Sequence, residues 1–197
     1  MAEYVIGVTG ASGAVCARDL ILAMAGLPSV KRLHVVMSRF ASQTIRAELK
    51  VDGSGEADLR RALTGDPSPR VVFHPPDNMA APISSGTYPT QGMVVIPCSV
   101  GTLGAIASGA TANLIHRAAD VTLKERRPLI LAVRETPLNG IHLRNLLTLS
   151  DAGAVVFPLT PSFYTLPVDV KSIVEQFTAR ILDLLGLEHS LGKRWGA

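Results

Sequence analysis

Two stretches of small residues, each directly after a short apolar run, carry the groups best suited to hold an anionic ligand. The first, residues 9–13 (TGASG), follows an apolar run over residues 4–9 and precedes a helical pattern. Free backbone N–H groups in such a turn and the positive end of a helix both attract phosphate. The pattern favours a phosphate or flavin site, and the alternative is a tight turn that simply needs glycine.

The second stretch, residues 97–102 (PCSVGT), repeats this arrangement after another apolar run. Its hydroxyl and N–H groups could hold a second part of the same ligand, or Ser99 could merely cap a helix. Cys98 has no histidine nearby in the sequence, so we interpret it as a small buried side chain. The first turn lacks the G-x-G-x-x-G spacing, and Ser38 stands where an acidic residue would follow the second strand, which disfavours NAD.

A third group of residues is charged. Arg117, Asp120 and Lys124 fall at helical spacing on one face, and Arg134 and Glu135 follow the next predicted strand. The spacing permits a convergent cationic site in which Lys and Arg bind phosphate oxygens and a carboxylate acts as an acid or base. Ion pairs on a solvated helix face are the competing interpretation.

The elements that must position these groups alternate between short apolar runs and helical patterns. Strands are predicted over residues 4–9, 33–37, 71–73, 93–96, 129–133 and 154–157. Helices are predicted over residues 14–25, 40–49, 56–63, 112–126, 141–149 and 170–185, with one more directly after residues 98–102. Residues 74–92, rich in Pro, Gly, Ser and Thr, form a long irregular segment. The order predicts an α/β fold, with a Rossmann-like or flavodoxin-like parallel sheet covered by helices on both faces and ligands at the carboxyl ends of its strands.

Length and composition bound the remaining possibilities. The 197 residues, 47% of them hydrophobic, predict one domain over residues 1–197 with a substantial core. Only 18% are charged and the mean hydropathy is +0.30, which predicts a homo-oligomer that covers part of its surface. The net charge is +3 and the basic residues are scattered apart from a cluster at residues 124–127 (KERR), which argues against a nucleic-acid partner.

Several classes of protein are disfavoured by what the chain contains. Two cysteines suit a reducing cytosol, and five histidines without paired spacing predict no metal site. The N-terminus has no signal-peptide pattern and no apolar run approaches the length of a bilayer span, so we expect a cytoplasmic protein without membrane contact. Trp195, near the C-terminus, could pack on a neighbouring subunit or belong to a frayed tail.

Five segments read together closely resemble the UbiX-like flavin prenyltransferases. They are TGASGA (residues 9–14), GMVVIPCS (residues 92–99), NLIHRAADVTLKERR (residues 113–127), RETPL (residues 134–138) and PSFY (residues 161–164). The glycine-rich turn alone is a weak signal, whereas the run through Arg127 followed by RETPL is specific. The resemblance extends from about residue 4 to the C-terminus.

The resemblance implies a homo-oligomer, typically a dodecamer, that binds FMN and dimethylallyl monophosphate without a metal. The enzyme would join the dimethylallyl group to N5 and then C6 of reduced FMN, release phosphate, and supply prenylated FMN to a UbiD-type decarboxylase. The residues matching the cofactor set are Gly10, Ala11, Ser12, Ser38, Ser99, Val100, Gly101, Thr102 and Arg134. The residues matching the prenyl phosphate set are Lys124, Glu135, Tyr164 and Arg180, with Arg117 contributed across a subunit interface.

Three residues match positions implicated in the chemistry: Glu135 as proton donor or relay at the departing phosphate, Ser12 near N5, and Glu48 at the flavin edge. Some relatives have an aromatic residue near the position of Met79, and this chain has none, so a ring there cannot stabilise an allylic cation. The segment ISSGT, residues 83–87, also differs slightly from the family pattern.

Two alternatives remain open from the sequence. A flavin-dependent decarboxylase of cysteinyl substrates shares the fold but would need a substrate-clamping Asn-Met segment and a catalytic histidine, and Asn78-Met79 matches such a segment only at chance level. A non-catalytic flavin carrier or accessory subunit would tolerate replacement of Glu135 by glutamine.

Overall fold

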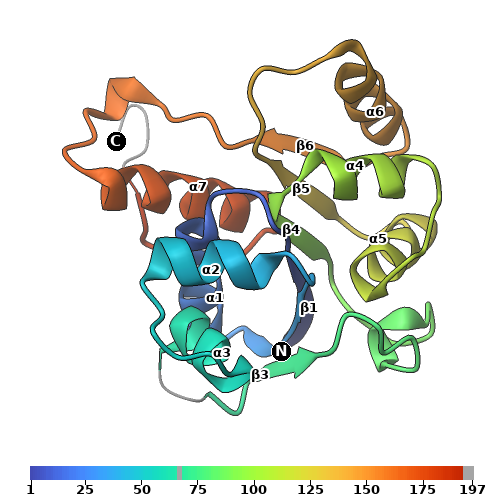
Figure 1. The fold of residues 1–197 in the computed structure, drawn as a ribbon, viewed down its shortest axis with the longest axis horizontal. Helices are drawn as coiled ribbons and strands as arrows, with labels where there is room; N and C mark the ends of the chain where they lie inside the picture. Colours follow the sequence, from blue (N-terminus) through green and yellow to red (C-terminus); the bar gives the residue numbers. More distant parts are fainter. Residues whose placement is uncertain (66–67, 193–197) are drawn as a thin grey trace.

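A single six-stranded parallel β-sheet forms the centre of the computed structural model, which describes residues 1–65 and 68–192 (Figure 1). The strand order is β3-β2-β1-β4-β5-β6. The strands are β1 (Ala2–Val8), β2 (Val30–Met37), β3 (Val71–His74), β4 (Met93–Cys98), β5 (Leu129–Val133) and β6 (Val155–Pro158). The predicted parallel α/β fold is therefore confirmed. Trp195, for which the sequence leaves two interpretations, lies outside the described residues.

Helices cover both faces of the sheet, as the sequence predicts (Figure 1). The helices packed around α1 on one face are α1 (Ala14–Gly26), α2 (Ala41–Leu49), α3 (Glu56–Thr64) and α7 (Val170–Leu184). The helices packed around α4 on the other face are α4 (Val100–Ala107), α5 (Leu114–Lys124) and α6 (Gly140–Asp151). Each face has its own buried apolar cluster, and strands enclosed on both sides read as continuous apolar runs.

The chain changes from one face to the other between β3 and β4. The connection is the 75–92 segment, an irregular stretch with one short 3₁₀ helix, η1 (Pro82–Ser84). As a result, β1 and β4 are neighbouring strands, and the helices that follow them, α1 and α4, lie on opposite faces of the sheet. In such sheets the crevice at the carboxyl ends of these two strands is the usual ligand site.

The largest difference from the predicted elements concerns the helix over residues 112–126. The observed helix α5 is shorter because the side chain of Asn113 caps its N-terminus, accepting a hydrogen bond from His116 N–H at 3.0 Å. At the other end, Arg126 adopts φ 56°, which ends the helix. A second 3₁₀ helix, η2 (Phe163–Thr165), precedes α7. Over residues 1–65 and 68–192, none of the helices has the length and apolar character to cross a bilayer.

Candidate active site

A cavity of about 410 Å³ lies at the carboxyl ends of the strands, next to the crevice between β1 and β4. Its volume falls within the range of roughly 300–1,000 Å³ found for small-molecule sites. Its walls come from the turns after β1, β2 and β4, the start of the 75–92 segment and the N-terminus of α5. The lining residues predicted from the sequence as cofactor ligands are Gly10, Ser38, Ser99, Gly101 and Thr102. Ala11, Ser12 and Val100 belong to the same turns.

Two helix N-termini meet at this cavity. Ser99 caps α4, accepting a hydrogen bond from Thr102 N–H at 3.3 Å, and Asn113 caps α5. Both caps line the cavity. The turns after β1 and β4 are joined by the Thr9 hydroxyl, which donates to Pro97 O at 2.5 Å and accepts from Ser99 N–H at 2.9 Å. The positive ends of two helix dipoles and the surrounding hydroxyl groups suit an anionic or strongly polar ligand.

Gly10 is required because Phe40 approaches it closely. A Cβ atom at Gly10 would lie 2.7 Å from Phe40 Cβ and 3.2 Å from the Phe40 backbone. Phe40 lines the cavity and is 74% exposed. The glycine of the first turn thus allows the start of α2 to form a wall of the site.

Glu48, which the resemblance assigns to the flavin edge, is bound to the turn after β1. Its carboxylate accepts hydrogen bonds from Gly13 N–H at 2.9 Å and Ala14 N–H at 2.7 Å, so it caps the N-terminus of α1. The sequence predicts free N–H groups over residues 9–13, and for Gly13 that prediction is wrong. The acceptor comes from α2, and a pairing across 35 residues leaves no local signal in the sequence. Gly13 itself has φ +120°, a conformation that favours glycine.

Replacing Glu48 by glutamine is expected to destabilise the protein. Loss of a charged acceptor at a helix N-terminus costs about 0.5–2 kcal/mol, which lowers the melting temperature of a chain this size by roughly 1–8 °C. Thermal unfolding followed by circular dichroism measures the effect. Gln43→Ala, at an exposed position on the same helix, is the matched control. An unchanged melting temperature in Glu48→Gln would contradict the capping role.

Tyr164 and Arg180 line a second cavity, of about 440 Å³, between η2, α7 and the C-terminal segment. Both side chains are exposed, and Arg180 forms an ion pair with Asp183 at 3.0 Å. The structure therefore keeps these two predicted substrate residues together, but in a cavity other than the one that Gly10 and Ser99 line.

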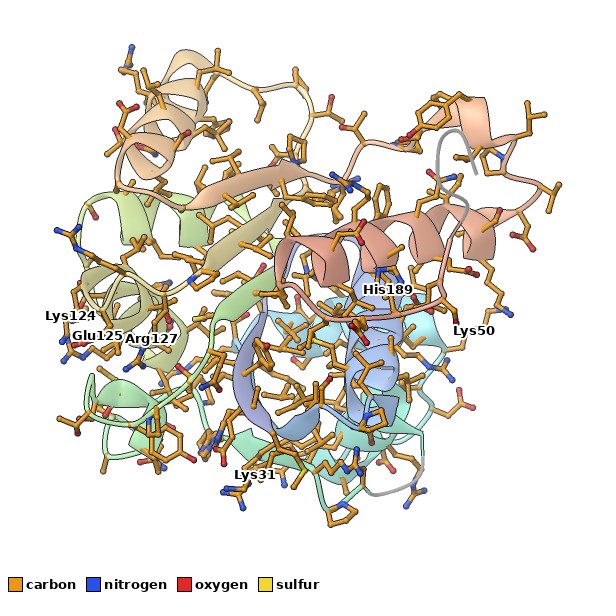
Figure 2. The ribbon with its side chains drawn as sticks, turned by 180° about the vertical axis from the view of Figure 1, so that it is seen from behind. Lys31, Lys50, Lys124, Glu125, Arg127 and His189 are labelled. Carbon is orange, nitrogen blue, oxygen red and sulfur yellow. The ribbon has the colours of Figure 1, made fainter. Side chains whose placement is uncertain are left out.

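The spacing in the sequence permits Arg117, Lys124 and Glu135 to converge, but within one chain Lys124 lies far from the carboxyl ends of the strands, where Glu135 lies. Helix α5 runs antiparallel to the strands, so that its start lines the cavity while Lys124, at its last position, lies about 15 Å away along the helix axis. Lys124 pairs there with Glu125 (Figure 2). Strand β5 then returns to the carboxyl edge before Glu135. Helical spacing correctly predicted that Arg117 and Lys124 share one face of α5. It did not show that α5 runs away from the cavity, so that Lys124 at its end lies far from it.

Arg117, Arg134 and Glu135 occupy three different settings. Arg117 pairs with Asp120 at 2.7 Å and donates to Ser84 O at 3.1 Å, which ties α5 to the 75–92 segment. Arg134 directly follows β5, and its N–H donates to Cys98 O at 3.1 Å beside the second turn. Glu135 is exposed, and its Oε1 accepts from Thr136 N–H at 3.0 Å.

Sequence reasoning missed about half of the cavity wall. The cavity-lining residues that it did not name as site residues are Arg39, Phe40, Pro76, Asp77, Ala112, Asn113 and His116. Arg39 and Phe40 follow Ser38 directly, and extension of that turn by two residues would have found them. His116 is buried, its pKa is lowered by burial, and its Nδ1 has no hydrogen-bond partner within residues 1–65 and 68–192.

Neither cysteine has the properties of a nucleophile. Burial raises the pKa of Cys98 to about 12, and burial with the charges of Asp19 and Glu48 raises the pKa of Cys16 to about 11. Both thiols are therefore protonated at neutral pH. Within the part of the chain that the structure describes, no group of three His, Cys, Asp or Glu side chains is arranged to hold a metal ion.

Comparisons with known proteins agree on one family. The Flavoprotein family model matches residues 2–184. A flavin prenyltransferase UbiX of Halalkalibacterium halodurans is 42% identical over 98% of this chain and 93% of its own. A probable UbiX-like flavin prenyltransferase of Escherichia coli O157:H7 is 44% identical over 98% of this chain and 92% of its own.

Two solved structures extend the agreement to the whole fold. AnUbiX (PadA1) in complex with FMN and dimethylallyl pyrophosphate is 41% identical, with a TM-score of 0.88 over 100% of this chain and 98% of that one. A dodecameric FMN-dependent Ubix-like decarboxylase from E. coli O157:H7 is 42% identical, with a TM-score of 0.88 over 99% of this chain and 100% of that one. The extent of these matches, together with the glycine-rich turns at the carboxyl edge, shows that this chain belongs to the UbiX-like flavin prenyltransferase family.

Proposed function

We propose that this protein is a flavin prenyltransferase that joins the dimethylallyl group of dimethylallyl monophosphate to N5 and C6 of reduced FMN. The observation that carries the proposal is the cavity between the turns after β1, β2 and β4, in a chain 41% identical to a protein solved with FMN and dimethylallyl pyrophosphate. The products are prenylated FMN and phosphate, and a UbiD-type decarboxylase consumes the prenylated flavin.

The residues present fit FMN. The cavity offers two helix N-termini, the hydroxyls of Ser38, Ser99 and Thr102, and the apolar ring of Phe40. This mixture suits a ligand with a planar ring and a phosphate. Cofactor contacts are assigned to Gly10, Ala11, Ser12, Ser38, Ser99, Val100, Gly101, Thr102 and Arg134. When bound in its reduced form, FMN supplies the nucleophilic atoms N5 and C6.

The charged residues are assigned to the prenyl phosphate. Lys124, Arg117 and Arg180 neutralise its oxygens, Tyr164 donates a hydrogen bond, and Glu135 donates a proton to the departing phosphate. Ser12 lies in the turn that would face N5. Glu48 acts through the turn that it caps, because both of its carboxylate oxygens already accept hydrogen bonds from that turn.

A complete site is proposed to need more than one copy of the chain. In one chain, Glu135 lies at the carboxyl ends of the strands and Lys124 lies toward the opposite ends. A neighbouring copy therefore has to bring its Lys124 and Arg117 to the substrate. Helix α6 supports association, because Ile141, Leu143 and Leu147 are all more than half exposed. Because the relative from E. coli is a dodecamer, we propose that this protein also assembles as a dodecamer. We place this assembly in the cytoplasm.

The decarboxylase alternative has one specific observation in its favour. The E. coli structure, 42% identical to this chain, is that of an FMN-dependent Ubix-like decarboxylase, whereas the relative from the same strain is a probable UbiX-like flavin prenyltransferase. Cysteine decarboxylases such as TvaF are only 19% identical and share the fold alone. We therefore retain decarboxylation as the second candidate function.

An anaerobic assay tests the proposal. The purified protein is mixed with reduced FMN and dimethylallyl monophosphate, and the flavin mass and the released phosphate are measured. A flavin that gains one C5 prenyl unit, with stoichiometric phosphate, is the expected result. An unchanged flavin mass with this donor and with dimethylallyl diphosphate would overturn the proposal, and cysteinyl peptides would then be tested as substrates.

A further inference from the structure

A buried cluster of titratable side chains lies outside the candidate active site, under the 75–92 segment. Its members are Glu3 on β1, His34 on β2, His74 at the end of β3 and Tyr88 in the segment. His34 is 2% exposed and Glu3 is 9% exposed. Neither the proposed chemistry nor the cavity described above uses these four residues.

The cluster forms one continuous chain of hydrogen bonds. Glu3 Oε2 accepts from the Tyr88 hydroxyl at 2.5 Å and from His34 Nε2 at 3.1 Å. Because Nε2 is the donor, a neutral His34 has a free acceptor at Nδ1, and His74 Nε2–H donates to it at 2.9 Å. The two imidazole rings also stack, with centroids 5.2 Å apart, and Tyr88 packs edge-on against His34.

Besides Glu3 on β1, charged groups near the cluster come from β2 and from the chain after α5. Lys31 pairs with Glu3 Oε1 at 3.0 Å, and Arg32, on the same strand, places a positive charge near His34 and Tyr88. Arg127, after α5, donates to Tyr88 O at 2.9 Å. Lys31 marks this edge of the molecule in Figure 2.

We propose that the His34–His74 pair is a proton-controlled clasp that positions the 75–92 segment, and with it one wall of the cavity. His74 is the residue directly before the segment, and Tyr88 belongs to it. Pro76 and Asp77, two and three residues beyond His74, line the cavity, and Ser84 O holds Arg117. Two neutral rings keep the clasp closed.

Protonation opens the clasp for two reasons. The first proton places a charge on a buried ring, which burial disfavours. The second turns both facing nitrogens, His34 Nδ1 and His74 Nε2, into donors, so the hydrogen bond between them is lost. Loss of this bond removes a side-chain contact between β2 and the end of β3, next to the backbone pairing of Val36 with His74, and so loosens the start of the segment.

The direction of the pH effect follows from the buried groups. Burial lowers the pKa of His34 despite Glu3, and burial with repulsion from His34 lowers the pKa of His74. Burial opposes ionisation of Glu3, but hydrogen bonds from Tyr88, His34 and Lys31 outweigh it and lower the pKa of Glu3 to about 2. The open state therefore binds more protons than the closed state, and closure weakens as the pH falls below about 6.5 while Glu3 stays ionised.

Hydrogen exchange of the flavin-free protein tests the clasp without depending on the proposed function. Protection of the amides in the 75–92 segment, among them Ala81, Ser84 and Gln91, is measured at pH 7.5 and pH 5.5 and corrected for intrinsic exchange. We expect protection to fall about tenfold for each histidine that gains a proton on opening. Amides of α7, far from the cluster, serve as the internal reference.

Two variants separate the clasp from general destabilisation. His74→Gln retains a neutral donor and is expected to reduce the pH-dependent loss of protection by about tenfold. His142→Gln, which keeps a residue suited to the capping box of α6, is the control and should behave as the wild type. Wild-type protection that is equal at both pH values would overturn the proposal, as would an equal pH-dependent loss in His74→Gln and wild type. The wild-type comparison remains decisive if His74→Gln does not fold.

Discussion

A Glu135→Gln variant is expected to bind FMN with wild-type affinity and to lose prenyl transfer by about 10²- to 10⁴-fold. That range is typical when a positioned general acid is removed. Glutamine keeps the shape of the side chain and can still accept from Thr136 N–H, as Glu135 does at 3.0 Å. Because Glu135 is exposed at the carboxyl edge of β5, the substitution should not disturb the fold.

Single-turnover phosphate release under anaerobic conditions measures the loss, and flavin fluorescence measures FMN binding. Glu56→Gln is the matched control, because Glu56 is an exposed carboxylate whose ion-pair partner, Arg60, lies on the same helix α3. Activity within a few-fold of wild type in Glu135→Gln would remove Glu135 from the chemistry. It would also favour the carrier or accessory-subunit alternative, which predicts tolerance of this substitution.

The parallel sheet and its turns were predictable because their signals are local. The central strands β1, β4 and β5 are apolar runs buried almost throughout, and the two glycine-containing turns are short stretches of small residues directly after β1 and β4. The order of strands and helices then fixes where these turns meet, since all strands run parallel. The turns at Gly10 and Ser99 were therefore predicted to lie at the same edge of the sheet, and the family resemblance added Ser38; all three residues line one cavity.

The features that escaped prediction depend on pairs far apart in the sequence. Glu48 reaches the turn at Gly13 across 35 residues, and Tyr88 reaches Glu3 across 85. The residues on either side of Glu48 and Tyr88 in the sequence give no indication of these partners. The direction of α5 relative to the sheet explains why Lys124, although correctly placed on a helix face, lies far from Glu135.

Because Lys124 and Glu135 lie far apart in one chain, we expect the Lys124→Ala variant to lose activity. We also expect a second inactive variant to restore part of that activity in a mixed oligomer. Removing a cation from a phosphate site costs about 1.5–3 kcal/mol, so prenyl transfer should fall roughly 10- to 150-fold. Lys124 pairs with its neighbour Glu125, and the side chain of Lys124 is about half exposed, so its loss should leave the fold intact. FMN binding should also stay unchanged, because the FMN cavity lies at the other end of α5.

Mixed oligomers of Lys124→Ala and Glu135→Gln test whether the two residues come from different copies. In a randomly mixed assembly, about a quarter of the sites would combine an intact Glu135 from one chain with an intact Lys124 from a neighbour. Co-expression with two different affinity tags, followed by tandem purification, yields these mixed assemblies for the phosphate-release assay. Recovery toward a quarter of wild-type activity is the expected result. If both residues acted from the same chain, every site would keep one defect, so the mixture would be no more active than the better of the two single variants.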